Sequence, residues 1–125
     1  MAAFKVLIVE DSVTMRQLLC FALQRLREVE IVQAGNGLEG LKVVQGGGVD
    51  VALIDINMPI MDGFKLIQHI RQDQHHAKLP IIVITTESKP EHVEKAKELG
   101  VNHYITKPIR QSEVLQKVRG LLNLQ

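Results

Sequence analysis

The chain has 125 residues, 46% of them hydrophobic and 23% charged, and its 15 basic and 14 acidic residues give a formal net charge of +1. Residues 1–125 fit a single domain with one core, and this balanced charge argues against nucleic acid or an anionic membrane as a partner. The single cysteine, Cys20, excludes an internal disulfide, and no apolar run approaches the roughly 20 residues of a membrane span. We expect a small soluble cytoplasmic domain.

The first half of the sequence alternates between strand and helix patterns. The apolar run 6–9 is rich in Val and Ile, which is typical of a strand buried on both faces of a parallel sheet. Helical spacing of apolar residues follows over 15–26. A weaker strand candidate at 30–33 precedes a second helical face at 38–44, which the glycines at 46–48 end.

The second half repeats this alternation. The apolar runs 51–54 and 81–84 predict two more buried strands, and a helical face at 64–70 lies between them. A fourth helix with few apolar residues leads to a weak strand candidate at 103–105, and a last helix covers about 111–122. Five strand–helix repeats predict an α/β fold with a parallel, doubly wound sheet and helices on both of its faces.

Two helix starts carry capping residues. Asp11 or Ser12 can cap the first helix. Ser88 followed by Glu91, with Pro90 in the first turn, predicts a capping box for the fourth helix.

Polar residues end four of the five predicted strands. The carboxyl ends of parallel strands share one edge of the sheet, which is where doubly wound folds bind ligands. The residues that we expect at this edge are Glu10, Asp11, Asp55, Thr85, Thr86, Thr106 and Lys107.

Three carboxylates in one place need a counter-charge, because like charges raise one another's pKa and oppose burial. Lys107 supplies one positive charge, which is not enough to balance three carboxylates. Oxygen ligands without histidine or cysteine favour a hard divalent ion, and we predict Mg²⁺. Carboxylate, hydroxyl and lysine groups around Mg²⁺ are suited to phosphoryl transfer, with a carboxylate as the acceptor.

Four motifs carry a resemblance to a known family: Val-Glu-Asp-Ser at 9–12, Asp-Ile-Asn-Met-Pro-Ile-Met-Asp-Gly at 55–63, Thr-Thr-Glu at 85–87 and Lys-Pro at 107–108. Over about residues 4–122 the chain resembles the receiver domains of two-component response regulators, and in particular the single-domain chemotaxis regulators of the CheY type. The resemblance implies a flavodoxin-like fold with five parallel strands in the order 2-1-3-4-5.

The resemblance also implies roles for the acidic residues. Asp55 is expected to be the phosphoacceptor, and Glu10 and Asp11 form the acidic pair. Asp11, Asp55 and the backbone carbonyl of Asn57 are expected to hold Mg²⁺, with Glu10 in the same metal site. The Asn57 side chain occupies one of two positions that tune loss of the phosphoryl group in this family.

Further roles fall on the later strands. The resemblance implies that Lys107 contacts the phosphoryl group, that Thr85 is the switch hydroxyl, with Thr86 beside it, and that Tyr104 is the switch aromatic residue. Glu87 occupies the second tuning position, and a cis peptide bond is expected before the proline that follows Lys107.

Three positions depart from the CheY type. Glu10 stands where CheY has Asp, and Thr86 is bulkier than the small residue often found there, which narrows access to Asp55. Lys89-Pro90 replaces two lysines, which weakens the implication of a flagellar-motor partner.

The leading hypothesis is a phosphorylation-activated switch in chemotaxis or motility control. A sensor histidine kinase would donate the phosphoryl group to Asp55, and a downstream protein would bind the face formed by the fourth helix, residues 103–105 and the last helix. We expect a monomer that only phosphorylates itself from a donor and dephosphorylates itself, with no turnover of another substrate.

The sequence leaves three other functions open. The chain could be the receiver part of a longer regulator or a phosphorelay intermediate, although residues 121–125 complete a helix without a linker. A Mg²⁺-dependent phosphatase of the haloacid dehalogenase type would want an aspartate in place of Asn57. A flavodoxin-like FMN carrier would bind phosphate in its first loop, where Glu10 and Asp11 would repel it.

Overall fold

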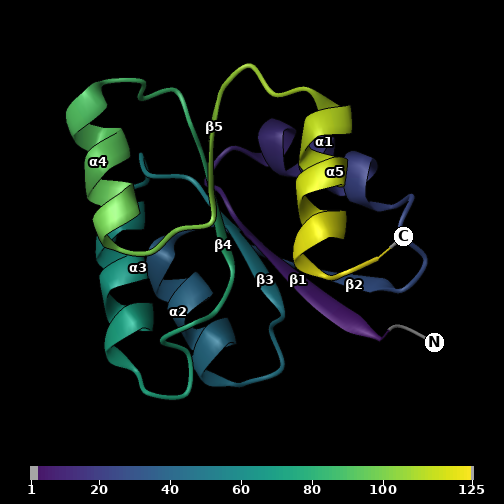
Figure 1. The fold of residues 1–125 in the computed structure, drawn as a ribbon, viewed down its shortest axis with the longest axis horizontal. Coiled ribbons are helices and arrows are strands. Elements are labelled where there is room, and N and C mark those ends of the chain that lie inside the picture. The colour runs from purple at the N-terminus through teal and green to yellow at the C-terminus, as the bar shows by residue number, and fades with distance from the viewer. Residues whose placement is uncertain (1–2, 125) are drawn as a thin grey trace.

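The computed structural model describes residues 3–124, and strands and helices alternate throughout them (Figure 1). In chain order the elements are β1 (Phe4–Val9), α1 (Val13–Leu23), β2 (Val29–Ala34), α2 (Gly37–Gln45), β3 (Val51–Ile54), α3 (Gly63–Gln72), β4 (Ile81–Thr85), α4 (Pro90–Glu98), β5 (His103–Thr106) and α5 (Gln111–Leu121). In this described part of the chain, none of the helices is both long and apolar enough to cross a membrane.

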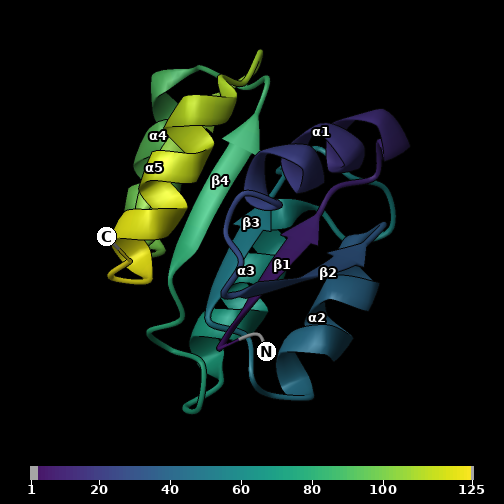
Figure 2. The same ribbon diagram turned by 90° about the vertical axis from the view of Figure 1, so that its right-hand side faces the viewer.

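The five strands form one parallel sheet in the order β2-β1-β3-β4-β5, so the predicted fold and strand order are confirmed. Helices α1 and α5 cover one face of the sheet, and α2, α3 and α4 cover the other (Figures 1 and 2). Each strand therefore delivers its carboxyl end to the same edge.

Both faces of the central strands are buried. Along β1, Leu7 and Val9 pack under α2 and α3, whereas Val6 and Ile8 pack under α1 and α5. This two-residue alternation explains the uninterrupted apolar runs of the inner strands. The outer strands β2 and β5 keep half-buried and exposed residues, which is why their patterns are weaker in the sequence.

Helix α1 begins as expected. Ser12 is its N-cap and its hydroxyl oxygen accepts a hydrogen bond from the Met15 N–H at 3.2 Å. The predicted capping box of the fourth helix is wrong. Lys89 is the N-cap of α4, without a side-chain cap, and Ser88 lies one residue too early.

Pro90 explains this difference. Proline favours the first helical position and forces the residue before it into an extended conformation. Lys89 has φ −63° and ψ 139°, so the helix begins only at Pro90.

Candidate functional site

The pairing of β1 with β3 places Glu10 beside Asp55. Val9 and Ile54 are partners in register at the ends of these strands, and the Asp55 N–H donates to the Val9 carbonyl oxygen at 3.0 Å. The pairing of the two strands therefore fixes the positions of Glu10 and Asp55, which directly follow them. Both residues are buried, with 2% of Glu10 and 4% of Asp55 exposed.

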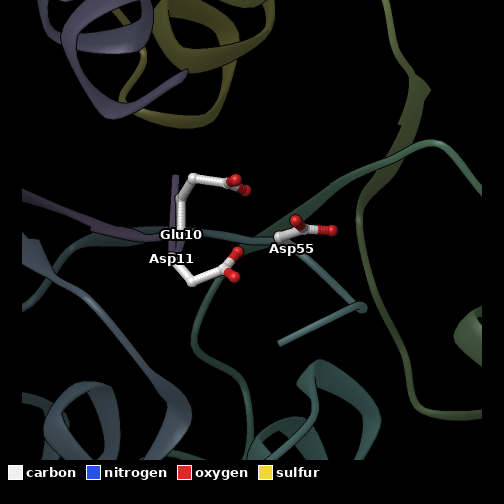
Figure 3. A group of neighbouring side chains, drawn as sticks. All are labelled: Glu10, Asp11 and Asp55. Carbon is white, nitrogen blue, oxygen red and sulfur yellow. The ribbon is translucent and has the colours of Figure 1, made fainter. Parts of the chain in front are cut away.

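Three carboxylates converge at this edge. One oxygen atom from each of Glu10, Asp11 and Asp55 lies within 4.8 Å of the other two, and the Glu10 and Asp11 side chains extend toward Asp55 (Figure 3). Asp11 is exposed, so the cluster has an open side. Carboxylate oxygens in this arrangement fit a hard divalent cation such as Mg²⁺.

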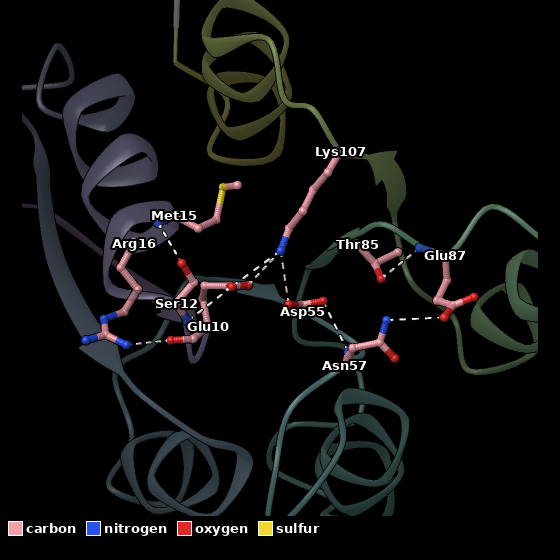
Figure 4. A network of polar contacts seen from close by, with 9 residues as sticks. All are labelled: Glu10, Ser12, Met15, Arg16, Asp55, Asn57, Thr85, Glu87 and Lys107. Atoms are coloured by element: carbon pink, nitrogen blue, oxygen red, sulfur yellow. Dashed lines mark hydrogen bonds and ion pairs between the residues drawn. The ribbon is translucent and has the colours of Figure 1, made fainter.

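Lys107 bridges two of the carboxylates (Figure 4). Its Nζ lies 3.1 Å from Asp55 Oδ2 and 3.3 Å from both carboxylate oxygens of Glu10. The Lys107 N–H donates to the Thr85 carbonyl oxygen at 2.7 Å, and the peptide bond to Pro108 is cis, as expected. The lysine thus reaches the acidic centre from the end of β5.

Burial and the neighbouring charges shift the pKa values of Glu10 and Lys107. Burial, together with the hydrogen bond and negative charge of Asp55, raises the pKa of Glu10 from 4.5 to about 7, although Lys107 opposes this shift. For Lys107, burial lowers the pKa, but the charges and hydrogen bonds of Asp55 and Glu10 outweigh it and raise the pKa above its ordinary value. The lysine stays charged at neutral pH, while Glu10 sits near its titration point.

Glu87 lies at the centre of a second group of contacts beside Asp55. Its N–H donates to Thr85 Oγ1 at 3.2 Å, and its carbonyl oxygen accepts from the Tyr104 hydroxyl at 2.5 Å. Its carboxylate oxygen Oε1 accepts from Asn57 Nδ2 at 3.3 Å, and the Asn57 N–H donates to Asp55 Oδ1 at 3.2 Å (Figure 4). Burial, and then the charge of Glu87, raises the pKa of Tyr104.

Thr86 lies apart from these contacts. Its side chain is exposed at the bend that follows β4, whereas Thr85 is buried at the strand end. The structure therefore brings together the predicted residues Glu10, Asp11, Asp55 and Lys107, with Thr85 and the Asn57–Glu87 pair next to them, and leaves Thr86 at the rim.

Comparison with known proteins decides the family. Residues 6–119 match the family model described as the response regulator receiver domain. This chain belongs to the response regulator receiver family. It is 37% identical to the chemotaxis protein CheY-3 of Vibrio cholerae over 114 residues, which cover 91% of this chain and 88% of the relative.

Solved structures agree with this assignment. The crystallised chemotaxis protein CheY4 of V. cholerae superposes with a TM-score of 0.88 at 32% identity, covering 96% of this chain and 99% of that one. The Mn²⁺-bound form of the response regulator Rcp1 superposes with a TM-score of 0.81 at 27% identity, covering 94% and 91%. The chain thus spans almost the whole length of these proteins.

Two further residues shape the site of this receiver domain: Arg16, which the sequence reasoning missed, and Gly63, which it included only as part of the 55–63 motif. Arg16 Nη1 donates to the Glu10 carbonyl oxygen at 2.6 Å, which fixes the first acidic loop from α1. Gly63 packs so closely on the chain that follows β3 that a Cβ atom at this position would lie 2.3 Å from the Asp55 backbone oxygen. The Asp-Gly pair at 62–63 was the available signal for the second residue, and Arg16 had none.

Proposed function

We propose that this receiver domain is a phosphorylation-driven switch in which Asp55 accepts a phosphoryl group from the phosphohistidine of a sensor kinase. The observation that carries the proposal is the convergence of the buried Asp55 carboxylate with Glu10, Asp11 and Lys107 at one sheet edge. Three carboxylates and one lysine offer a nucleophile, a cation site and a positive charge at the same edge of the sheet.

In the proposed step, a carboxylate oxygen of Asp55 attacks the phosphorus atom. A P–O bond forms as the P–N bond to the kinase histidine breaks, and the imidazole nitrogen keeps the electron pair. Lys107, 3.1 Å from Asp55 Oδ2, is placed to offset the negative charge that arrives with the phosphoryl oxygens. Water attack on the phosphorus later releases phosphate and restores the Asp55 carboxylate.

Mg²⁺ is the proposed cofactor, held by Asp11, Asp55 and the backbone carbonyl of Asn57, with Glu10 beside them. When bound, the ion neutralises charge on the phosphoryl oxygens. Support comes from the donor set, because the oxygens of the three acidic residues lie within 4.8 Å of one another. The structural neighbour Rcp1 was crystallised with a divalent ion, Mn²⁺.

The output is proposed to be a change in the face formed by α4, β5 and α5. Thr85 and Tyr104 both contact Glu87, so a pull on the Thr85 hydroxyl acts on the loop that leads into α4. Ala96 is the one buried residue of α4, whereas each of the other helices has at least two, so few packing contacts oppose a movement of this helix. We propose a downstream protein as the partner of this face, and chemotaxis as the process because the relatives are chemotaxis proteins.

We further propose that the chain turns over no other substrate, acts as a cytoplasmic monomer and binds neither nucleic acid nor membrane directly. The test of the proposed function is labelling with ³²P-acetyl phosphate in Mg²⁺ and in EDTA. We expect Mg²⁺-dependent labelling of the wild type and of Asp73→Asn, an aspartate outside the cluster, and none of Asp55→Asn. Labelling that persists in Asp55→Asn overturns the proposal.

A further inference from the structure

We propose that His92 is a positioning residue for Glu87 and so sets how fast the phosphoryl group is lost from Asp55. This inference rests on the proposed function, and it adds a residue of α4 to the two positions that the family resemblance implicates in this reaction. His92 lies in the first turn of α4 and does not belong to any of the motifs described above.

The imidazole of His92 is held in place by α3. Its ring stacks on that of Phe64 with the centroids 6.0 Å apart and an angle of 9° between the planes. Lys95, one turn further along α4, places its Nζ 4.7 Å from the centre of the same phenyl ring. Stacking between two helices fixes both the place and the tilt of the imidazole, so that its Nδ1 faces a defined direction.

That direction is the carboxylate of Glu87. His92 Nδ1 lies 3.6 Å from Glu87 Oε2, which is an ion-pair distance but too long for a hydrogen bond. Among residues 3–124, Nδ1 of His92 is the one buried side-chain nitrogen or oxygen atom without a hydrogen-bond partner. A buried polar atom without a partner is costly, and a small approach of Glu87 removes that cost.

Glu87 is thereby held at four points. Thr85 and Tyr104 fix its backbone, Asn57 holds Oε1, and His92 faces Oε2. Because Asn57 also reaches Asp55 through its N–H, the position of this carboxylate is coupled to the acceptor. The Glu87 carboxylate and the Asn57 amide therefore lie beside the Asp55 carboxylate that would carry the phosphoryl group, and release of Oε2 from His92 alters the surroundings of that group.

Two substitutions separate the polar contact from the packing of the ring. Leucine and asparagine have the same branching at Cγ, but only asparagine has a nitrogen donor at the place of Nδ1. We expect His92→Leu to change the rate constant of ³²P-phosphoryl loss about threefold to fivefold, in the same direction as Glu87→Ala, which is the size expected for one partly exposed ion-pair contact. We expect His92→Asn, which keeps a nitrogen donor but loses the stacked ring, to restore most of the wild-type rate, and His69→Leu, at an exposed position of α3, to leave that rate unchanged.

A Glu87→Ala background completes the kinetic test. There His92→Leu should have no further effect, since the carboxylate that it positions is gone. Equal changes in His92→Leu and His92→Asn, or a full effect of His92→Leu without Glu87, overturn the proposal. Circular dichroism and urea unfolding of each variant show that a folded protein was compared.

A second measurement does not depend on phosphorylation. Long-range ¹H–¹⁵N spectra report the tautomer and hydrogen bonding of each histidine side chain. We expect Glu87→Ala to move the Nδ1 resonance of His92 and to leave those of His69, His75 and His103 in place. If the His92 resonance does not move, the contact proposed here is wrong, whereas absence of labelling in the wild type would overturn the proposed function instead.

Discussion

Glu10 should make the stability of this receiver domain fall as the pH rises toward neutrality. Burial and the neighbouring Asp55 raise its pKa from 4.5 to about 7 in the folded protein, against the opposing effect of Lys107. Between these two pH values the folded state holds a proton that the unfolded chain has released. Since the folded state binds more protons there, the free energy of unfolding decreases with pH through this window and is flat on either side of it.

The size of this effect follows from the displacement of the pKa. A pKa raised from 4.5 to about 7 corresponds to about 3 kcal/mol, at roughly 1.4 kcal/mol for each tenfold change. Solvent does little to screen this effect, because only 2% of the Glu10 side chain is exposed. Against a typical total stability of about 5–15 kcal/mol, such a loss is large.

Urea unfolding measures how much the ionisation of Glu10 contributes to the free energy of unfolding, when the wild type is compared with Glu10→Gln, which never ionises. The comparison is made in EDTA from about pH 4 to about pH 8. The wild type should lose about 3 kcal/mol relative to Glu10→Gln over that range. His103 affects the pH dependence of stability in the opposite direction, because burial and then Lys117 lower its pKa. This effect is present in both proteins and cancels in their difference. Parallel curves for the two proteins would refute the reasoning, and Glu30→Gln on the exposed side of β2 is the matched control.

Three further substitutions test, by urea unfolding, contacts at the site and at the opposite edge of the sheet. Gly63→Ala should lower the free energy of unfolding by about 2–3 kcal/mol, because the new Cβ meets the Asp55 backbone. The control Gly120→Ala, whose Cβ would meet nothing within 4 Å, should be neutral or slightly stabilising. Equal effects of the two substitutions would contradict the clash at Gly63. Lys107→Met should lower the free energy of unfolding by about 3 kcal/mol at about pH 8, and by less at about pH 5, where one carboxylate can take a proton. An unchanged urea midpoint at about pH 8 would argue against a stabilising role of the ion pairs. Arg71→Met should cost about 2 kcal/mol, because the guanidinium donates to three main-chain oxygens at 2.8–3.3 Å, and a loss below about 0.5 kcal/mol would show that these bonds add little.

The sheet and its acidic edge could be predicted because they depend on periodic and local signals. Residues buried on both faces of a strand leave continuous apolar runs, and the parallel order puts the residues after those runs at one edge. Glu10, Asp55 and Lys107 therefore meet although they are far apart in the sequence. The strands β2, β4 and β5 differ from the prediction by one residue at one or both ends, and β1 begins two residues earlier than predicted.

What could not be predicted depends on contacts between elements. The Ser88 cap was a plausible local pattern, but Pro90 decides the start of α4. The stacking of His92 on Phe64 depends on how α3 and α4 pack side by side, and no spacing in the sequence records it. The same holds for Arg16, whose bond to the Glu10 backbone depends on the direction of α1.

The central claim is that the phosphoryl group is attached to Asp55. Borohydride reduces an aspartyl phosphate to homoserine, and tandem mass spectrometry of the digested protein locates the converted residue. After incubation with acetyl phosphate and Mg²⁺, we expect homoserine at position 55 and at no other aspartate. Conversion at Asp11 or at any other position, or no conversion in a protein shown to be folded, would contradict it.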